Sequence, residues 1–265
     1  MSKSKGLASS LQIAIESARQ AIGPTRHNPS LPACPLCGAQ AVEGHLYHHA
    51  TDIRHDCDCI LDRYNAYMRG LERLWNIPLY TKRFQDSLPQ RLKAASFETL
   101  KIHPGNRAAA KTLSGLKVGD VAYLWGLPGR GKSFLSVAAA RLLLPHGLRV
   151  AFWNEANLYA ALRASFGKPE HRPDLTKYDV LIWDDMGKIK AQDWGYELTY
   201  HALEHYTSEG KTLIITSQYE PVDTAKRMTP SDVDAAAAVI SRMSSGYVLE
   251  VRGKDWRVNV NGEEK

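Results

Sequence analysis

The chain has 265 residues, of which 44% are hydrophobic, and a formal net charge of +6. This length can form one large domain and a small one, and no apolar run approaches the roughly 20 residues that a membrane-spanning helix needs. Because the first residues also lack the apolar core of a signal peptide, we expect a soluble cytoplasmic protein that makes no membrane contact.

The positive charge is concentrated in one part of the chain. Residues 76–117 hold 8 basic and 2 acidic residues, whereas residues 1–75 hold 8 and 7 and residues 118–265 hold 18 and 19. The middle stretch therefore accounts for the whole excess, as 8 minus 2 gives +6. Such a stretch favours contact with a polyanion. A solvated basic linker is the alternative.

The first predicted element is a helix over residues 7–22, which Gly23 and Pro24 should end. A proline-rich loop follows it. The chain then reaches its four cysteines, which are Cys34, Cys37, Cys57 and Cys59. Their confinement to one short window argues against a disulfide framework and favours a metal site.

The spacing of these cysteines is typical of structural zinc. Cys34 and Cys37 are separated by two residues and followed by Gly38, as in a zinc knuckle, whose backbone N–H groups point at the sulfurs. Together with Cys57 and Cys59 they supply the four thiolates of a tetrahedral Zn²⁺ site. The C-x-C spacing of the second pair is tighter than usual. One of the intervening histidines could replace a cysteine: His45, His48, His49 or His55.

Residues 60–75 carry apolar and aromatic side chains at helical spacing and predict a helix that leaves the metal site. Pro78 should break this helix. We therefore expect a small α-helical zinc-binding domain over residues 1–75, a basic connector over 76–106 and the larger domain over 107–265. A further helix should begin at the start of this larger domain, before its first strand.

The segment Gly126-Leu-Pro-Gly129-Arg-Gly131-Lys132-Ser133 fits the P-loop pattern G-x-x-x-x-G-K-[ST]. An apolar segment precedes it and an alanine-rich one follows, so the motif lies between a predicted strand and a predicted helix. Its glycines let backbone N–H groups face phosphate oxygens at the start of the helix. Lys132 should bind the β- and γ-phosphates of ATP, and the Ser133 hydroxyl should bind Mg²⁺.

Two further predicted strands end in polar residues. Asp184 and Asp185 follow an apolar segment, so Asp184 is placed to bind Mg²⁺ through water and Asp185 to orient the attacking water. Gln218 follows the strand over residues 212–217 and could contact the γ-phosphate or that water. Ordinary solvated strand ends are the alternative for both positions.

The larger domain alternates between strands and helices. This pattern predicts an α/β fold in which a five-stranded parallel sheet carries helices on both faces. The candidate strands are residues 120–125, 149–153, 179–184, 212–217 and 247–251.

These motifs resemble those of a known family. The P-loop, the Asp-Asp pair, the Thr-Ser-Gln strand end and the segment Ile240-Ser-Arg242-Met243 are similar to the DnaC/DnaI-type helicase loaders. Those loaders are AAA+ ATPases related to the transposition ATPase IstB. The resemblance covers roughly residues 76–260. Many loader-like proteins also carry an N-terminal cysteine cluster, which IstB-like proteins generally lack.

The resemblance implies roles for individual residues. Arg242 aligns with the arginine finger, which reaches the ATP of a neighbouring subunit, and Arg257 aligns with the second sensor arginine. Gln218 stands where the family usually has asparagine. Asp185 stands where many AAA+ enzymes have glutamate, which suits a slow, switch-like ATPase. A helix-surface arginine is the alternative for Arg242.

The resemblance also implies contact with nucleic acid. In loaders and initiators the region that corresponds to residues 155–166 approaches single-stranded DNA. Tyr159, Arg163 and Phe166 could stack on bases and contact phosphates there. The alternative is an amphipathic helix that packs on the sheet.

The resemblance implies a slow ATPase that loads a replicative DNA helicase onto single-stranded DNA and self-associates through its ATP sites. The zinc-bearing domain would bind the helicase. One alternative is an IstB-like transposition helper that binds duplex DNA and a transposase, which the cysteine cluster disfavours. The other is a P-loop kinase of a small molecule, which would need a substrate pocket, a lid and no arginine from a second subunit.

Overall fold

A computed structural model describes most of the larger domain and parts of the N-terminal region. The chain divides into two compact units, Met1–Leu71 and Glu72–Lys265. The predicted helix over residues 7–22 and the sensor candidate Arg257 lie outside the described residues, which are 26–27, 29, 33–34, 36–43, 54–55, 57, 59–189, 193–229 and 232–256.

The N-terminal unit contains short strands that the sequence analysis did not predict. Strands β1 (Arg26–His27), β2 (Ala41–Glu43) and β3 (Arg54–His55) pair antiparallel in the order β1-β2-β3. Strands of two or three residues are too short to show an alternating pattern. Helix α2 (Cys59–Trp75) begins at the last cysteine, which confirms the predicted helix that leaves the cysteine cluster.

The segment after α2 is folded rather than extended. Helix α3 (Ile77–Ser87) carries Pro78 in its first turn, where the missing N–H of proline has no helical partner to lose. The short 3₁₀ helix η1 (Gln90–Leu92) and helix α4 (Arg107–Leu113) follow. The side chains of Phe84, Leu88 and Leu92 are buried. The expected connector is therefore part of the core of the larger unit, and Pro78 opens a helix instead of only ending one.

All five predicted strands of the larger domain are confirmed. They form one parallel sheet in the order β5-β6-β7-β4-β8. The strands are β4 (Val121–Trp125), β5 (Val150–Asn154), β6 (Val180–Met186), β7 (Thr212–Ser217) and β8 (Tyr247–Glu250). The connecting elements are α5 (Lys132–Leu143), η2 (Leu144–His146), α6 (Glu155–Ala164), η3 (Pro169–His171), α7 (Asp193–Ser208), α8 (Pro221–Met228) and α9 (Val233–Met243).

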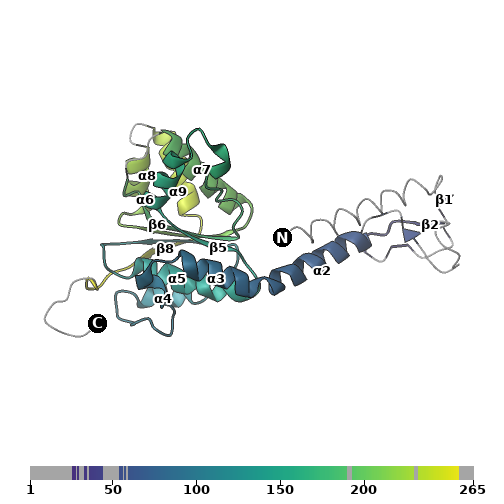
Figure 1. The fold of residues 1–265 in the computed structure, drawn as a ribbon, viewed down its shortest axis with the longest axis horizontal. Helices are drawn as coiled ribbons and strands as arrows, with labels where there is room; N and C mark the ends of the chain where they lie inside the picture. Colours follow the sequence, from purple (N-terminus) through teal and green to yellow (C-terminus); the bar gives the residue numbers. More distant parts are fainter. Residues whose placement is uncertain are drawn as a thin grey trace. The chain divides into compact units, whose positions relative to one another are not determined.

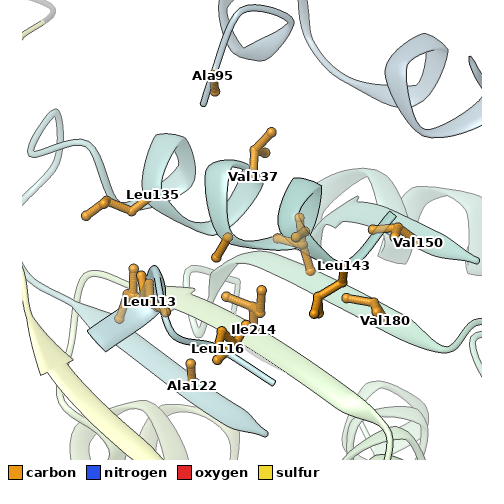
Figure 2. Packing of buried hydrophobic residues seen from close by; sticks show 14 of the residues in the cluster. Ala95, Leu113, Leu116, Ala122, Leu135, Val137, Leu143, Val150, Val180 and Ile214 are labelled. Carbon is orange, nitrogen blue, oxygen red and sulfur yellow. The ribbon is translucent and has the colours of Figure 1, made fainter. Parts of the chain in front are cut away.

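Helices cover both faces of this sheet. Helices α3, α4 and α5 lie on one face, and α6 to α9 lie on the other (Figure 1). A separate cluster of buried apolar side chains fills each interface. Figure 2 shows the first cluster, where Leu135, Val137 and Leu143 of α5 lie over Ala122, Val180 and Ile214 of the strands. No helix in the described part of the chain has both the length and the apolar character to cross a membrane.

The strand register brings the predicted site residues to one edge of the sheet. Trp125, the last residue of β4, pairs with Ser217 of β7. Met186 of β6 also pairs with Ser217, and Asn154 of β5 pairs with Asp184. Because all strands run parallel, the P-loop and the polar ends of β5, β6 and β7 meet at the carboxyl edge, where α/β sheets bind ligands.

Candidate nucleotide site and metal centre

The P-loop has the backbone conformation that its glycines permit. Gly126, Gly129 and Gly131 have φ values of 136°, 73° and 88°, which disfavour other residues. A Cβ on Gly126 would lie 2.4 Å from the carbonyl oxygen of Val251. Gly131 caps the N-terminus of α5, so the first N–H groups of the helix face the loop.

Lys132 lies inside this loop. Its side chain is buried, and Nζ donates hydrogen bonds to the carbonyl oxygens of Gly126 at 2.7 Å and Leu127 at 2.9 Å. Ser133 follows in the first turn of α5 and is partly buried. The ammonium group and the helix N-terminus thus place positive charge in the loop. These residues fit the triphosphate of ATP, and the Ser133 hydroxyl fits its Mg²⁺.

The segment after β8 packs against the P-loop, which the sequence did not indicate. The backbone N–H of Trp256 donates to the carbonyl oxygen of Gly129 at 3.0 Å. A Cβ on Gly129 would lie 1.7 Å from Asp255 Oδ1. The carboxylate of Asp255 therefore touches the backbone of the loop, and only glycine leaves room for it.

The two acidic residues at the end of β6 share one anchor. Asp184 is 1% exposed, and its Oδ1 accepts a hydrogen bond from Thr216 Oγ1 at 2.8 Å. The backbone N–H of Asp185 donates to the same Thr216 oxygen at 3.0 Å. Asp185 is the one non-glycine residue with positive φ, 60°, in the described part of the chain. Such strain persists where surrounding contacts enforce it, often at functional sites.

Asn154 is a site residue that the sequence analysis missed. Its Nδ2 lies 3.4 Å from Asp184 Oδ2 and 3.5 Å from Asp185 Oδ2. Its Oδ1 accepts the N–H of Ala156 and caps α6, which fixes the direction of the amide. Lys188 Nζ lies 3.4 Å from Asp185 Oδ2. Asn154 and Thr216 could have been found in the sequence, because each is a polar residue at the end of an apolar strand.

Gln218 and Arg242 lie in different surroundings. Gln218 follows β7 and is partly buried, next in sequence to the Ser217 that pairs with Trp125. Arg242 belongs to α9, and its side chain lies against α7. There it forms an ion pair with Glu204, donates to Tyr200 Oη at 2.9 Å and lies 4.6 Å from the centre of the Tyr200 ring. The proposed roles of both residues stay predictions.

One of the three predicted DNA-contacting residues is not accessible. Tyr159 is 1% exposed, and its hydroxyl lies 3.3 Å from Thr199 Oγ1. Its ring packs with the apolar cluster between α6, α7 and the sheet. Tyr159 therefore has no free face for a base, and packing on the sheet explains it instead. Arg163 is exposed and Phe166 is 61% exposed, so their contact with DNA stays a prediction.

The four cysteines converge as predicted. The sulfurs of Cys34, Cys37, Cys57 and Cys59 all lie within 4.8 Å of one another. Four sulfurs bound to one tetrahedral zinc ion would lie about 3.8 Å apart, so the arrangement fits Zn²⁺. Hydrogen bonds from the backbone of Leu36 and of Cys37 lower the pKa of Cys34 to about 6, which favours its thiolate form. The neighbouring Cys37 thiol raises the pKa of Cys59.

The sheet order and the site together define the class of the larger domain. A P-loop follows the strand β4, and a pair of carboxylates ends β6, two strands away in the order β5-β6-β7-β4-β8. This is the AAA+ type of P-loop ATPase fold. Residues 104–263 match the family model described as IstB-like ATP binding protein, so the chain belongs to that family.

Three curated relatives share about a quarter of their aligned residues with the chain. Phage-like element PBSX protein XkdC of Bacillus subtilis (strain 168) is 26% identical over 77% of this chain and 76% of its own length. A putative insertion sequence ATP-binding protein of Sinorhizobium fredii is 26% identical over 65% of this chain and 55% of its own. The chain spans only 32% of the chromosomal replication initiator protein DnaA of Zymomonas mobilis.

Solved structures share the fold of the larger domain. The crystal structure of DnaI covers 63% of this chain and 93% of its own, with a TM-score of 0.54 and 22% identity. A putative primosome component from Streptococcus pyogenes serotype M3 covers 64% and 92%, with a TM-score of 0.52 and 20% identity. The initiator DnaA bound to AMPPCP and single-stranded DNA covers 60% and 50%, with a TM-score of 0.50 and 21% identity.

Proposed function

We propose that the chain is an ATP-dependent loader of a replicative DNA helicase onto single-stranded DNA. The observation that carries this proposal is the cysteine cluster, which lies in a unit of its own before an IstB-like ATPase domain. Many loader-like members of the wider family carry such a cluster, whereas IstB-like transposition ATPases generally lack it. The likeness of the domain to DnaI and to a primosome component supports the same choice.

The geometry of the site supports ATPase chemistry. The P-loop and Lys132 would bind the triphosphate, and Ser133 and Asp184 would hold Mg²⁺, which shields charge on the phosphates. Asp185 would orient the attacking water, and Gln218 would contact the γ-phosphate or that water. Arg257 would contact the nucleotide of its own subunit.

Arg242 would complete the ATP site of a neighbouring subunit. Its guanidinium lies partly exposed on the surface of α9 and α7. An arginine supplied from a second subunit is worth on the order of 10³-fold in rate in other P-loop enzymes. Arg242→Ala should bind ATP nearly normally yet hydrolyse it poorly. Mixing it with Lys132→Ala should restore some activity, and mixing without rescue while both variants associate would contradict this role.

Contact with DNA would be largely electrostatic. Seven of the eight basic side chains between residues 76 and 117 are exposed, which are Lys82, Arg83, Arg91, Lys101, Arg107, Lys111 and Lys117. The exposed side chains of Arg163 and Phe166 add a phosphate contact and a stacking surface. Affinity for single-stranded DNA should fall steeply as salt rises. Affinity that stays flat between low and moderate salt would contradict this mode of binding.

The zinc-binding unit would contact the helicase. We expect one Zn²⁺ per chain, bound by the four cysteines, in protein purified without added zinc. Cys57→Ser should lose zinc and helicase binding while it keeps ATP binding, because the nucleotide site lies in the other unit. A substoichiometric zinc content, or a Cys57→Ser variant that keeps its zinc, would count against ligation by four cysteines.

Capture of a replicative helicase by the full-length chain tests the proposal directly. The chain should bind the helicase and, with ATP, increase the amount of helicase on single-stranded DNA. Lys132→Ala is the matched control, because it should retain helicase binding but fail to load. A chain that binds no replicative helicase under conditions where it binds ATP would overturn the loader assignment.

A transposition helper is the second candidate, and two comparisons favour it. The matching family model is that of IstB-like proteins, and the Sinorhizobium relative is described as an insertion sequence ATP-binding protein. Such a protein should prefer duplex DNA over single-stranded DNA and bind a transposase. Self-association with a non-hydrolysable ATP analogue, measured by size, separates both candidates from a small-molecule kinase, which should stay a monomer.

A further inference from the structure

The carboxylate of Glu155 is buried, and both of its oxygens accept hydrogen bonds. It is the first residue of α6, directly after Asn154, and its exposed fraction is 0%. Its Oε1 accepts the backbone N–H of Gly187 at 2.8 Å. Its Oε2 accepts the N–H groups of Lys188 at 3.0 Å and Ile189 at 2.9 Å. Three successive backbone donors thus converge on one side chain.

Those donors belong to the turn that follows Asp185. Side chains from other elements hold the rest of this turn. Thr216 accepts the N–H of Asp185, Ser217 Oγ donates to the carbonyl oxygen of Met186 at 2.8 Å, and Arg227 Nε donates to that of Gly187 at 2.9 Å. Every residue from 185 to 189 is therefore fixed by a side chain that lies elsewhere in the sequence, and Glu155 alone accounts for three of them.

Three backbone N–H donors favour an anion at position 155. Burial raises the pKa of Glu155, and the three backbone donors oppose that rise. A neutral glutamine of the same shape has one oxygen, so its NH₂ group would face at least one N–H donor. An aspartate would keep both oxygens on a shorter side chain. The two substitutions therefore separate the effect of charge from the effect of shape.

We propose that Glu155 is a positioning residue for ATP hydrolysis. This inference rests on the proposed ATPase function. By holding the three N–H groups after Asp185, Glu155 keeps the Asp185 backbone in its positive-φ conformation and its carboxylate directed at the reacting water. Glu155 is fully buried, so it would act through Asp185 and not by contact with nucleotide or metal. Its loss should therefore lower the rate of hydrolysis and leave the affinity for nucleotide nearly unchanged.

The experiment compares four full-length proteins: wild type, Glu155→Gln, Glu155→Asp and Asp179→Asn. Asp179 is the matched control, because its carboxylate also accepts a backbone N–H, that of Arg149. It lies just before β6, at the amino ends of the strands, away from the nucleotide site. The measurements are single-turnover ATP hydrolysis with the proposed DNA and helicase present, affinity for a non-hydrolysable ATP analogue, and thermal unfolding.

Glu155→Gln should hydrolyse ATP about 10- to 100-fold more slowly, as expected when a group that orients a catalytic ligand is lost. Its analogue affinity should stay within about threefold of wild type, and Glu155→Asp should recover part of the rate. Asp179→Asn should be less stable yet hydrolyse ATP at the wild-type rate.

A different set of results would overturn the role of Glu155. A Glu155→Gln variant that hydrolyses ATP at the wild-type rate would overturn it. So would a Glu155→Gln variant that is faster than Glu155→Asp, because shape would then matter more than charge. Equal loss of rate in Asp179→Asn would reduce the effect to general destabilisation. If Glu155→Gln fails to fold, Glu155→Asp against Asp179→Asn still decides. Wild-type protein that neither binds nor hydrolyses ATP would overturn the proposed function itself.

Discussion

The P-loop and the turn over residues 185–189 lie at the same edge of the sheet but are positioned in opposite ways. The P-loop takes its shape mainly from its own glycines and from the start of α5, with one backbone hydrogen bond from Trp256. The turn takes its shape from side chains of α6, β7 and α8, which are Glu155, Thr216, Ser217 and Arg227. One half of the site is thus encoded locally and the other half by long-range contacts.

This difference has a functional consequence. The P-loop offers backbone N–H groups and one lysine, which suit a ligand that is bound by its phosphates. The turn carries Asp185, whose direction depends on several separate elements. We therefore expect changes in the P-loop to affect nucleotide binding and changes around the turn to affect hydrolysis. Three predictions test this separation, and a fourth concerns helix α6.

The largest effect is expected for Lys132→Ala. The side chain places its ammonium group inside the loop, against the carbonyl oxygens of Gly126 and Leu127. Its removal takes away the fixed partner of the β- and γ-phosphate charge, so ATP binding should become undetectable by calorimetry. A folded variant with wild-type affinity would show that the loop is not the phosphate site.

Thr216→Val should affect the other half of the site. Valine keeps the shape but loses the hydroxyl that Asp184 and Asp185 share. The rate of hydrolysis should fall about 10- to 100-fold, and the Mg²⁺ concentration needed for half-maximal activity should rise. Thr207→Val, whose hydroxyl bonds only within α7, is the control. A variant that loses nucleotide affinity but not rate would break the proposed separation.

Gly129→Ala should give a smaller effect on binding. Alanine at a φ of 73° costs about 1–2 kcal/mol, and its Cβ would meet Asp255. Affinity for ATP should fall about tenfold. Combining it with Asp255→Ala should recover only the part due to that contact. Gly115→Ala, where the new Cβ lies 3.7 Å from the nearest atom, should change nothing.

The sequence predicted the locally encoded half of the site well. The P-loop motif, the strand before it and the helix after it were all recognisable, because each depends on residues close together in the chain. The cysteine cluster was recognisable for the same reason. Asp184 and Asp185 were found because a long apolar strand precedes them.

Sequence reasoning did not reach the contacts that join distant segments. Glu155 and Asn154 gave no sign of their partners in the 184–189 segment, and nothing indicated that Asp255 would reach Gly129. Residues 76–106 looked like a linker because of their prolines and charge. Phe84 of α3 and Leu88 directly after it are buried, and the exposed basic residues Lys82 and Arg83 next to Phe84 hid that pattern.

The smallest effect is expected for Tyr159→Phe, which separates core packing from DNA contact on α6. The variant loses the 3.3 Å hydroxyl contact with Thr199, whose own hydroxyl also donates to Gly195. The free energy of unfolding should fall by about 1 kcal/mol or less, measured by chemical denaturation. Affinity for single-stranded DNA should not change, because the ring is buried.

Phe166→Ala is the matched comparison, since that ring is 61% exposed at the end of the same segment. Loss of one stacking surface should weaken DNA binding by about 1–3 kcal/mol and leave the unfolding free energy within about 0.5 kcal/mol of wild type. If Tyr159→Phe weakens DNA binding more than Phe166→Ala does, α6 must open to expose its buried face when DNA binds. Equal and negligible effects of both variants would instead leave the basic side chains of residues 76–117 as the main DNA contact.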